Sequence, residues 1–242
     1  MGAARRIKSD WTAKVVAGSW LVLREMTREI GQPTPGFAAI SAVCNSSSGP
    51  MLDLRFKTPP EWLEAVFADF DAFLLDHAAC ERKAAATGMS FVVRYPDKSE
   101  LIEPLIEFAR EELEHFQIMY RIVHARGLIL ADDYKDAYVN ALRSQVQNGG
   151  PNVLLDKLLV AGIVEARGCE RLFMVAAALK ERDSPLAEAY LDLARAEARH
   201  HGLFFRLARA YFDDSLIDER AATLLDFEAE LVRRLPHRAA VH

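Results

Sequence analysis

The sequence predicts an all-α protein built around a four-helix bundle, and three observations lead to that class. Apolar residues recur at helical spacing along almost the whole chain after residue 60. No stretch of this region shows the sustained apolar-polar alternation that is typical of half-buried strands. Proline and glycine divide the region into four long helical segments, with one longer connection between the second and the third.

Proline, glycine and capping residues indicate where each helix is expected to begin and end. Segment 61–95 is expected to form one helix, or a short helix that leads into a long one. Asp97 is expected to cap a second long helix that ends near Arg126, because Gly127 provides a helix stop. The connection 128–150 is long enough to cross from one end of a bundle to the other. The remaining helices are expected at about 132–147, from Pro151 to about Glu181, from Ser184-Pro185 to about Phe212, and at about 215–234.

Composition and charge limit the classes of protein and of partner. The chain has 242 residues, 51% of them hydrophobic, which suits one domain or at most two. The net charge of −5 gives no basic surplus, so a nucleic-acid partner needs a local patch of positive charge. Cys44, Cys80 and Cys169 stand in no metal-binding spacing, which favours a reducing, cytoplasmic setting. We expect no membrane span, since no run of about 18 uncharged apolar residues is present.

Residues 1–50 differ from the rest of the chain. Basic residues precede the apolar stretch 15–23, in a weak imitation of a secretion signal without a clear cleavage site. The polar stretch 41–50 then interrupts the apolar pattern. We therefore expect either that Met51 is the natural start or that residues 1–50 form a poorly ordered N-terminal extension. One domain is expected over residues 51–242.

The motif Glu-x-x-His occurs twice, each time on a predicted long helix. Positions i and i+3 share one face of a helix, so each motif aims a carboxylate and an imidazole in the same direction. A single glutamate lies on the preceding long helix of each half, 31 residues before the first motif and 32 before the second. The candidate metal ligands are therefore Glu81, Glu112, His115, Glu165, Glu197 and His200.

This arrangement matches the dinuclear metal sites of ferritin-like bundles, in which two helices provide one Glu each and two provide Glu-x-x-His. Four carboxylates in a dry core would repel one another, and two divalent cations would cancel their charge. Oxygen and nitrogen ligands without a thiolate favour iron or manganese over a structural zinc ion. The predicted fold is a ferritin-like four-helix bundle with a long crossover that contains a short helix, plus extra terminal helices.

The two single glutamates are the less secure members of the set. One Glu-x-x-His pair alone would be read as a solvated helix face, so the interpretation depends on the repeat. Glu170 competes with Glu165, because residues 169–171 repeat the Cys-Glu-Arg of residues 80–82. The spacing favours Glu165, since Glu170 lies only 27 residues before the second motif. A shift of four residues would move a ligand by about one helical turn.

Several residues beside the candidate ligands keep two interpretations. His77 is either a partner of Glu81 or a polar core residue. Glu111 and Glu114 lie about 100° or more around the helix from the ligands, where solvation or an ion pair is expected. The partners that orient the two ligand histidines are not decided by helix register, and the candidates are Asp76, Asp156 and Asp192.

Four segments carry a resemblance to a known family. They are 76-DHAACERKAAATGMSF-91, 110-REELEHFQIMYRIVHARGL-128, 155-LDKLLVAGIVEARGCERLF-173 and 196-AEARHHGLFFRLA-208. In this order they resemble the tRNA 2-methylthio-N6-isopentenyladenosine hydroxylases, the MiaE-type tRNA monooxygenases. The block around Glu165 is the most specific of them. The family often has two adjacent histidines where this chain has Glu114-His115, and the ligand position is kept.

The resemblance implies a non-haem di-iron monooxygenase that hydroxylates a terminal methyl of the isopentenyl group on an adenosine beside the tRNA anticodon. Two iron ions, held by the six candidate ligands, and O2 as co-substrate are implied with it. An external reductase or small redox protein would supply electrons, since no flavin or nicotinamide fingerprint is present. A cytoplasmic monomer or small homo-oligomer is expected. The alternative is a ferritin-like di-iron protein for iron storage or peroxide detoxification.

Contacts to tRNA must come from local basic residues, because the overall charge is acidic. Lys157, Arg167 and Arg171 are the candidate substrate-binding residues, and Arg82 and Lys83 are further positions on ligand-bearing helices. Each of them could instead form a surface ion pair. The aromatic residues Phe173, Phe204 and Phe205 either line the prenyl pocket or pack in the core.

Overall fold

The computed structural model describes residues 54–130, 132 and 135–242, so the expectations about residues 1–50 lie outside the described part. All regular elements within the described part are helices, which confirms the all-α prediction. None of these helices has the length and apolar character that crossing a bilayer requires. In chain order they are α3 (Glu61–Ala68), α4 (Phe70–Arg94), α5 (Ser99–Ala125), α6 (Ala137–Arg143), α7 (Val153–Leu179), α8 (Ser184–Arg209) and α9 (Asp214–Arg234).

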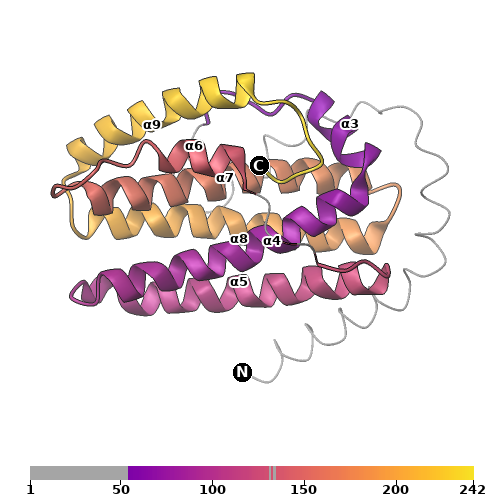
Figure 1. Cartoon of the computed structure of the whole chain (residues 1–242), viewed down its shortest axis with the longest axis horizontal. Helices are drawn as coiled ribbons and strands as arrows, with labels where there is room; N and C mark the ends of the chain where they lie inside the picture. Colours follow the sequence, from indigo (N-terminus) through magenta and orange to yellow (C-terminus); the bar gives the residue numbers. More distant parts are fainter. Residues whose placement is uncertain (1–53, 131, 133–134) are drawn as a thin grey trace.

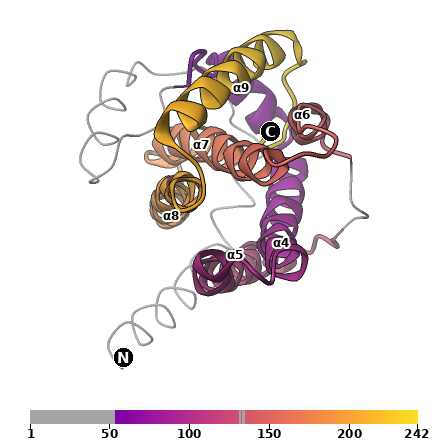
Figure 2. The same cartoon turned by 90° about the vertical axis from the view of Figure 1, so that its left-hand side faces the viewer.

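Two antiparallel hairpins form the bundle. α4 packs along α5 and α7 packs along α8, and these two pairings provide most of the contacts between helices. Figure 1 shows the four long helices lying roughly parallel, with α9 lying over α7 and α8. In the end-on view of Figure 2, the hairpins form two separate pairs, and α6 lies beside α7. The crossover between α5 and α7 carries α6, so the predicted topology is confirmed.

Local capping explains most of the boundaries and corrects two of them. The expected short helix before a long one is present, because the Asp69 side chain accepts a hydrogen bond from the Ala72 amide and starts α4. Gly127 follows the end of α5 with a φ of 73°, as predicted. Asp97 does not cap α5, which begins after Lys98 without a side-chain cap. Asp183 caps α8 in place of Ser184.

One glycine in each hairpin allows its two helices to approach closely. A Cβ atom on Gly88 would lie 2.7 Å from the Phe108 ring of α5, and one on Gly162 would lie 2.8 Å from the Phe205 ring of α8. Such a contact is shorter than packed carbon atoms allow. Each hairpin is therefore held at a separation that places the ligands of its two helices next to each other.

The bundle is open between α4 and α7. The backbones of the two hairpins approach each other most closely between α5 and α8, and side chains of α4 also contact α8, as His77 contacts Tyr190. The backbones of α4 and α7 make almost no close approach. A cavity of about 870 Å³ lies on this side of the bundle. Its walls come from α4, α7, the α6 segment, residues 146–149 and residues 241–242. The arrangement leaves a route from the surface to the middle of the bundle.

Candidate metal centre

The six candidate ligands come together in the middle of the bundle, one or two from each long helix. Their ligand atoms form two overlapping groups in which all atoms lie within 4.8 Å of one another. Glu112 and Glu197 belong to both groups, which is the position of carboxylates that bridge two ions. The first group is Glu81, Glu112, His115 and Glu197, and the second is Glu112, Glu165, Glu197 and His200.

The histidine nitrogens face the carboxylates at distances suited to sharing a cation. His115 Nδ1 lies 3.5 Å from Glu112 Oε2 and 3.6 Å from Glu81 Oε2. His200 Nδ1 lies 2.6 Å from Glu112 Oε1 and 3.8 Å from Glu197 Oε2. Neighbouring ligand atoms around one such ion stand about 3 Å or more apart, given metal–ligand bonds of about 2.0–2.2 Å. Three of these four distances fit that spacing, and the 2.6 Å between His200 and Glu112 is shorter.

Four buried ligand atoms of the cluster have no hydrogen-bond partner. They are both carboxylate oxygens of Glu112, Nδ1 of His115 and Nδ1 of His200. The close approach between His200 and Glu112 therefore lacks the geometry of a hydrogen bond. Leaving a buried polar atom without a partner costs about 1–3 kcal/mol. Metal ions would satisfy all four atoms at once, so the residues present fit a dinuclear centre.

The charges of the cluster fit two divalent cations as well. Burial, followed by the neighbouring Glu197 and Glu81 carboxylates, raises the pKa of Glu112 to about 8. Burial and Glu197 also raise the pKa of Glu165 well above its usual value. Burial opposes the charged form of His115, but the nearby carboxylates of Glu112 and Glu81 outweigh it and raise its pKa to about 10.

The other three groups are shifted as well. Burial opposes the charged form of His200, but the nearby carboxylates of Glu111, Glu112 and Glu197 outweigh it and raise its pKa. Burial also opposes ionisation of Glu81 and Glu197, but contacts of Glu81 with His115 and His77, and of Glu197 with Glu165 and His200, lower both pKa values. The cluster thus gathers four buried carboxyl groups, whose negative charge two divalent cations would cancel.

Partners outside the cluster orient the ligands. His200 Nε2 lies 3.0 Å from Glu111 Oε2, and His77 Nε2 lies 2.6 Å from Glu81 Oε1. His77 Nδ1 in turn hydrogen-bonds with the Tyr190 hydroxyl at 3.3 Å. Of the two interpretations of His77, the structure therefore favours the partner of Glu81. Such partners fix the ring and raise the basicity of a ligand.

The three aspartates considered as such partners contact other groups. Asp156 pairs with Arg220, and Asp192 pairs with Arg195 at the surface. Asp76 accepts a hydrogen bond from the Val241 amide. Glu111 was missed as the partner of His200 because it lies on the other hairpin. The helical spacing of residues within one hairpin does not show which residues contact the other hairpin.

Glu170 lies outside the cluster. Its carboxylate accepts hydrogen bonds from the Thr58 backbone amide, the Thr58 hydroxyl and the Arg167 guanidinium. Glu165, the alternative that spacing favoured, is the residue that joins the other five. The repeated Cys-Glu-Arg is therefore a misleading match, because its two glutamates take different positions in the fold.

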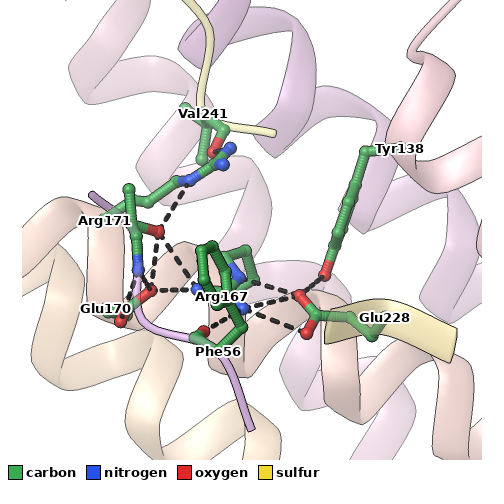
Figure 3. Close-up of polar contacts among 8 residues, drawn as sticks. Phe56, Tyr138, Arg167, Glu170, Arg171, Glu228 and Val241 are labelled. Atoms are coloured by element: carbon green, nitrogen blue, oxygen red, sulfur yellow. Dashed lines mark hydrogen bonds and ion pairs between the residues drawn. The ribbon is translucent and has the colours of Figure 1, made fainter. Parts of the chain in front are cut away.

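Two of the three residues expected to contact tRNA are instead part of the core, which corrects that expectation. The Arg167 side chain is fully buried and donates to both Glu228 carboxylate oxygens, to Glu170, to the Thr58 hydroxyl and to the Phe56 carbonyl. Arg171 is also buried and donates to the Val241 carbonyl at 2.8 Å. Figure 3 shows both guanidinium groups enclosed by these acceptors, with Tyr138 also donating to Glu228. Neither side chain can reach a phosphate.

Lys157, the third residue, lines the cavity beside Tyr95, to whose hydroxyl it donates at 3.3 Å. Lys83 lines the cavity as well. Sequence reasoning missed three further cations of the lining, namely Arg94, Lys135 and Arg143, of which two come from the crossover. The aromatic residues Phe173, Phe204 and Phe205 pack in the core and do not line the cavity.

The fold and the cluster together define a class: a ferritin-like bundle with carboxylates and histidines arranged for two metal ions. The family model described as tRNA-(MS[2]IO[6]A)-hydroxylase (MiaE) matches residues 50–242. The chain belongs to this family.

Two relatives are named tRNA 2-(methylsulfanyl)-N(6)-isopentenyladenosine(37) hydroxylase. The one from Pseudomonas putida is 36% identical over 73% of this chain and 84% of its own length. The one from Salmonella typhimurium is 26% identical over 74% of this chain and 83% of its own length. A solved structure, "Protein 43 with aldehyde deformylating oxygenase activity from Synechococcus", is similar with a TM-score of 0.71 and 36% identity, and the match covers 77% of this chain and 92% of that one.

Proposed function

We propose that this protein hydroxylates the isopentenyl group of 2-methylthio-N6-isopentenyladenosine in tRNA, with two iron ions held by the six clustered residues and O2 as co-substrate. One observation carries the proposal beyond family membership. Glu81, Glu165 and Glu197 of the cluster line the 870 Å³ cavity that opens between α4 and α7. A nucleoside bound in the cavity can therefore reach the carboxylates that would hold the metal ions.

The lining of the cavity suits a prenylated nucleoside. Its volume lies within the range of about 300–1,000 Å³ typical of small-molecule sites. Apolar side chains of α6 and α7 provide surface for a prenyl chain, among them Val139, Val160, Val164 and Leu172. Positive side chains provide partners for phosphates, and these are Lys83, Arg94, Lys135, Arg143 and Lys157. This local group of cations answers the objection from the net charge of −5.

Two bound iron ions would supply the reduction of O2 and the attack on an allylic C–H bond of the isopentenyl group. The protein itself holds and orients. Glu111 fixes the ring of His200, and His77 fixes the carboxylate of Glu81. The apolar wall places the prenyl chain beside the cluster and excludes water from it. Electrons come from an external reductase or small redox protein in the cytoplasm.

The test is a reaction of the purified, iron-loaded protein with tRNA that carries the thiomethylated prenyl adenosine, isotopically labelled O2 and a chemical reductant. A nucleoside digest analysed by mass spectrometry should show one labelled oxygen atom in the isopentenyl group. The Glu112→Ala variant should not form this product, while Glu114→Ala, changed on the exposed face of the same helix, should form it. The proposal would be contradicted if wild-type protein that contains two irons per chain left the prenyl adenosine without the added hydroxyl group.

The structural similarity to the Synechococcus protein supports one competing reaction, the removal of the formyl group of an aldehyde. The same preparation should therefore be offered a long-chain aldehyde under the same conditions. Turnover of the aldehyde without turnover of tRNA would favour that reaction. Binding of many irons per chain in a large assembly would favour iron storage.

A further inference from the structure

A second group of metal-binding side chains lies beside the cavity, outside the dinuclear cluster. It consists of Cys80 from α4, Asp136 at the start of α6, and His242 from the last segment of the chain, with ligand atoms within 4.8 Å of one another. His242 Nδ1 lies 3.6 Å from Asp136 Oδ2 and 3.9 Å from Cys80 Sγ. The first distance equals that between His115 Nδ1 and Glu81 Oε2 in the candidate dinuclear centre.

His242 is held in this place by the residues before it. Trp62 Nε1 donates to the Ala240 carbonyl at 3.1 Å, Arg171 donates to the Val241 carbonyl, and the Val241 amide donates to Asp76. Ala240 and Val241 are buried. The imidazole therefore stands at the cavity wall as a fixed group of the fold.

The His242 ring presents its Nδ1 atom to Asp136 and Cys80. The side chain is 7% exposed, and its ring stacks on Tyr138 with the planes 4° apart, which fixes the orientation of the ring. The distance of 3.6 Å from Nδ1 to Asp136 Oδ2 is longer than a normal hydrogen bond. It matches the roughly 3.3–3.6 Å between neighbouring ligand atoms in a tetrahedral site with bonds of about 2.0–2.3 Å, and the distance of 3.9 Å to Cys80 Sγ is somewhat longer.

The other two side chains have ligand atoms available. Asp136 Oδ1 caps α6 by accepting from the Tyr138 and Val139 amides, which leaves Oδ2 facing His242. Cys80 forms no disulfide, and its thiol donates a long hydrogen bond to Asp76 Oδ2 at 3.7 Å. The carboxylates of Asp76 and Asp136 both lie beside the sulfur, and a cation would offset their charge.

We propose that Cys80, Asp136 and His242 form a binding site for one divalent transition-metal ion of borderline softness, such as Zn²⁺. A thiolate, an imidazole and a carboxylate are a normal ligand set for zinc, with the fourth position left to water. Binding releases the thiol proton to solvent as the sulfur–metal bond forms. The ion would join α4, the crossover and the segment 240–242, and so fix three parts of the cavity wall. This site does not depend on the hydroxylase activity.

Cobalt is the probe, because a sulfur-to-cobalt charge-transfer band in the near ultraviolet reports a thiolate ligand. The dinuclear cluster has no sulfur ligand and cannot give this band. The experiment uses the full chain with Cys44→Ser, first stripped by a chelator, then loaded with Fe²⁺ without oxygen, then titrated with Co²⁺. The band should saturate at one Co²⁺ per chain and disappear when Zn²⁺ is added in excess.

Matched variants locate the site. Cys80→Ser should abolish the band, and His242→Ala should weaken cobalt binding by at least about tenfold. Cys169→Ser should retain the band, since this buried cysteine lies outside the group. No band in the parent protein, or an equal band in Cys80→Ser, would overturn the proposal. If Cys80→Ser does not fold, protection of Cys80 from alkylation by Zn²⁺ in the parent, lost in His242→Ala, gives the same decision.

Discussion

The two hairpins of the bundle carry the same candidate ligands but surround them differently. In the hairpin of α4 and α5, hydrogen bonds with His115 and His77 outweigh burial and lower the pKa of Glu81. In the hairpin of α7 and α8, burial and the Glu197 carboxylate raise the pKa of Glu165. Two glutamates in equivalent sequence positions therefore have pKa values that are shifted in opposite directions.

The difference comes from contacts that do not repeat between the hairpins. His77 lies one turn before Glu81 on α4 and hydrogen-bonds with it, whereas the residue one turn before Glu165 on α7 is Ala161. The contacts between the hairpins do not repeat either, since His77 contacts Tyr190 of the second hairpin and His200 contacts Glu111 of the first. The repeat in the sequence specifies the candidate ligands but not these partners.

Loss of a ligand shared by both groups should remove more bound iron than loss of a ligand that belongs to one group. Glu112→Ala removes a carboxylate common to both groups, so both ions should be lost and turnover should fall by well over about 100-fold. His115→Ala removes a ligand of the first group alone and should leave about one iron per chain. Iron analysis and turnover check this. Equal loss of iron in the two variants would contradict the assignment of Glu112 as a shared ligand.

The buried arginines of α7 have no counterpart on α4, where the buried ionisable groups are His77 and Glu81. Unfolding experiments can show this difference. Arg167→Ala leaves Glu228 buried without its partner and should lower the free energy of unfolding by about 3–5 kcal/mol in urea denaturation. Arg82→Ala, a change on the less buried surface of α4, should cost less than about 1 kcal/mol. If Arg167→Ala lowered the free energy of unfolding as little as Arg82→Ala, the ion pair of Arg167 with Glu228 would not stabilise the fold as expected.

Removal of a partner that crosses the hairpins should have a smaller effect than removal of a ligand. Glu111→Ala takes away the acceptor that fixes His200, so iron affinity should fall by about 10–100-fold. Glu114→Ala on the same helix is the control and should bind iron normally. Unchanged affinity in Glu111→Ala would mean that His200 is oriented by its other contacts.

The smallest effect is expected at the cavity. Lys157→Ala should weaken tRNA binding several-fold and reduce the slope of log affinity against log salt by about one, if Lys157 neutralises one phosphate. Iron content should not change, because Lys157 lies outside both ligand groups. Binding measurements at several salt concentrations check this. An unchanged slope would place the phosphate contacts on other cations of the lining.

The sequence was sufficient for the bundle and for the candidate ligands because both depend on helical periodicity and on a repeat. It was not sufficient to tell which basic residues are buried and which line the cavity. Arg167 and Lys157 are basic residues on the same helix, yet one is enclosed by Glu228 and the other lines the cavity. Helix register alone does not tell these faces apart, since α9 covers one of them.

The crossover shows a second limit. Lys135 and Arg143 reach the cavity because the segment around α6 packs against α7 and α9, a placement that depends on tertiary contacts. His242 reaches it through hydrogen bonds of residues 240 and 241 to distant side chains. No local pattern in the sequence carries this information.

The central claim is that two hairpins hold two ions between six side chains. Crystals of iron-loaded protein measured at the iron absorption edge test it most directly. We expect two peaks in the anomalous difference map, one within the group of Glu81 and His115 and one within the group of Glu165 and His200, with Glu112 and Glu197 between them. Absence of iron from this cluster, or iron bound only elsewhere on the chain, would contradict it.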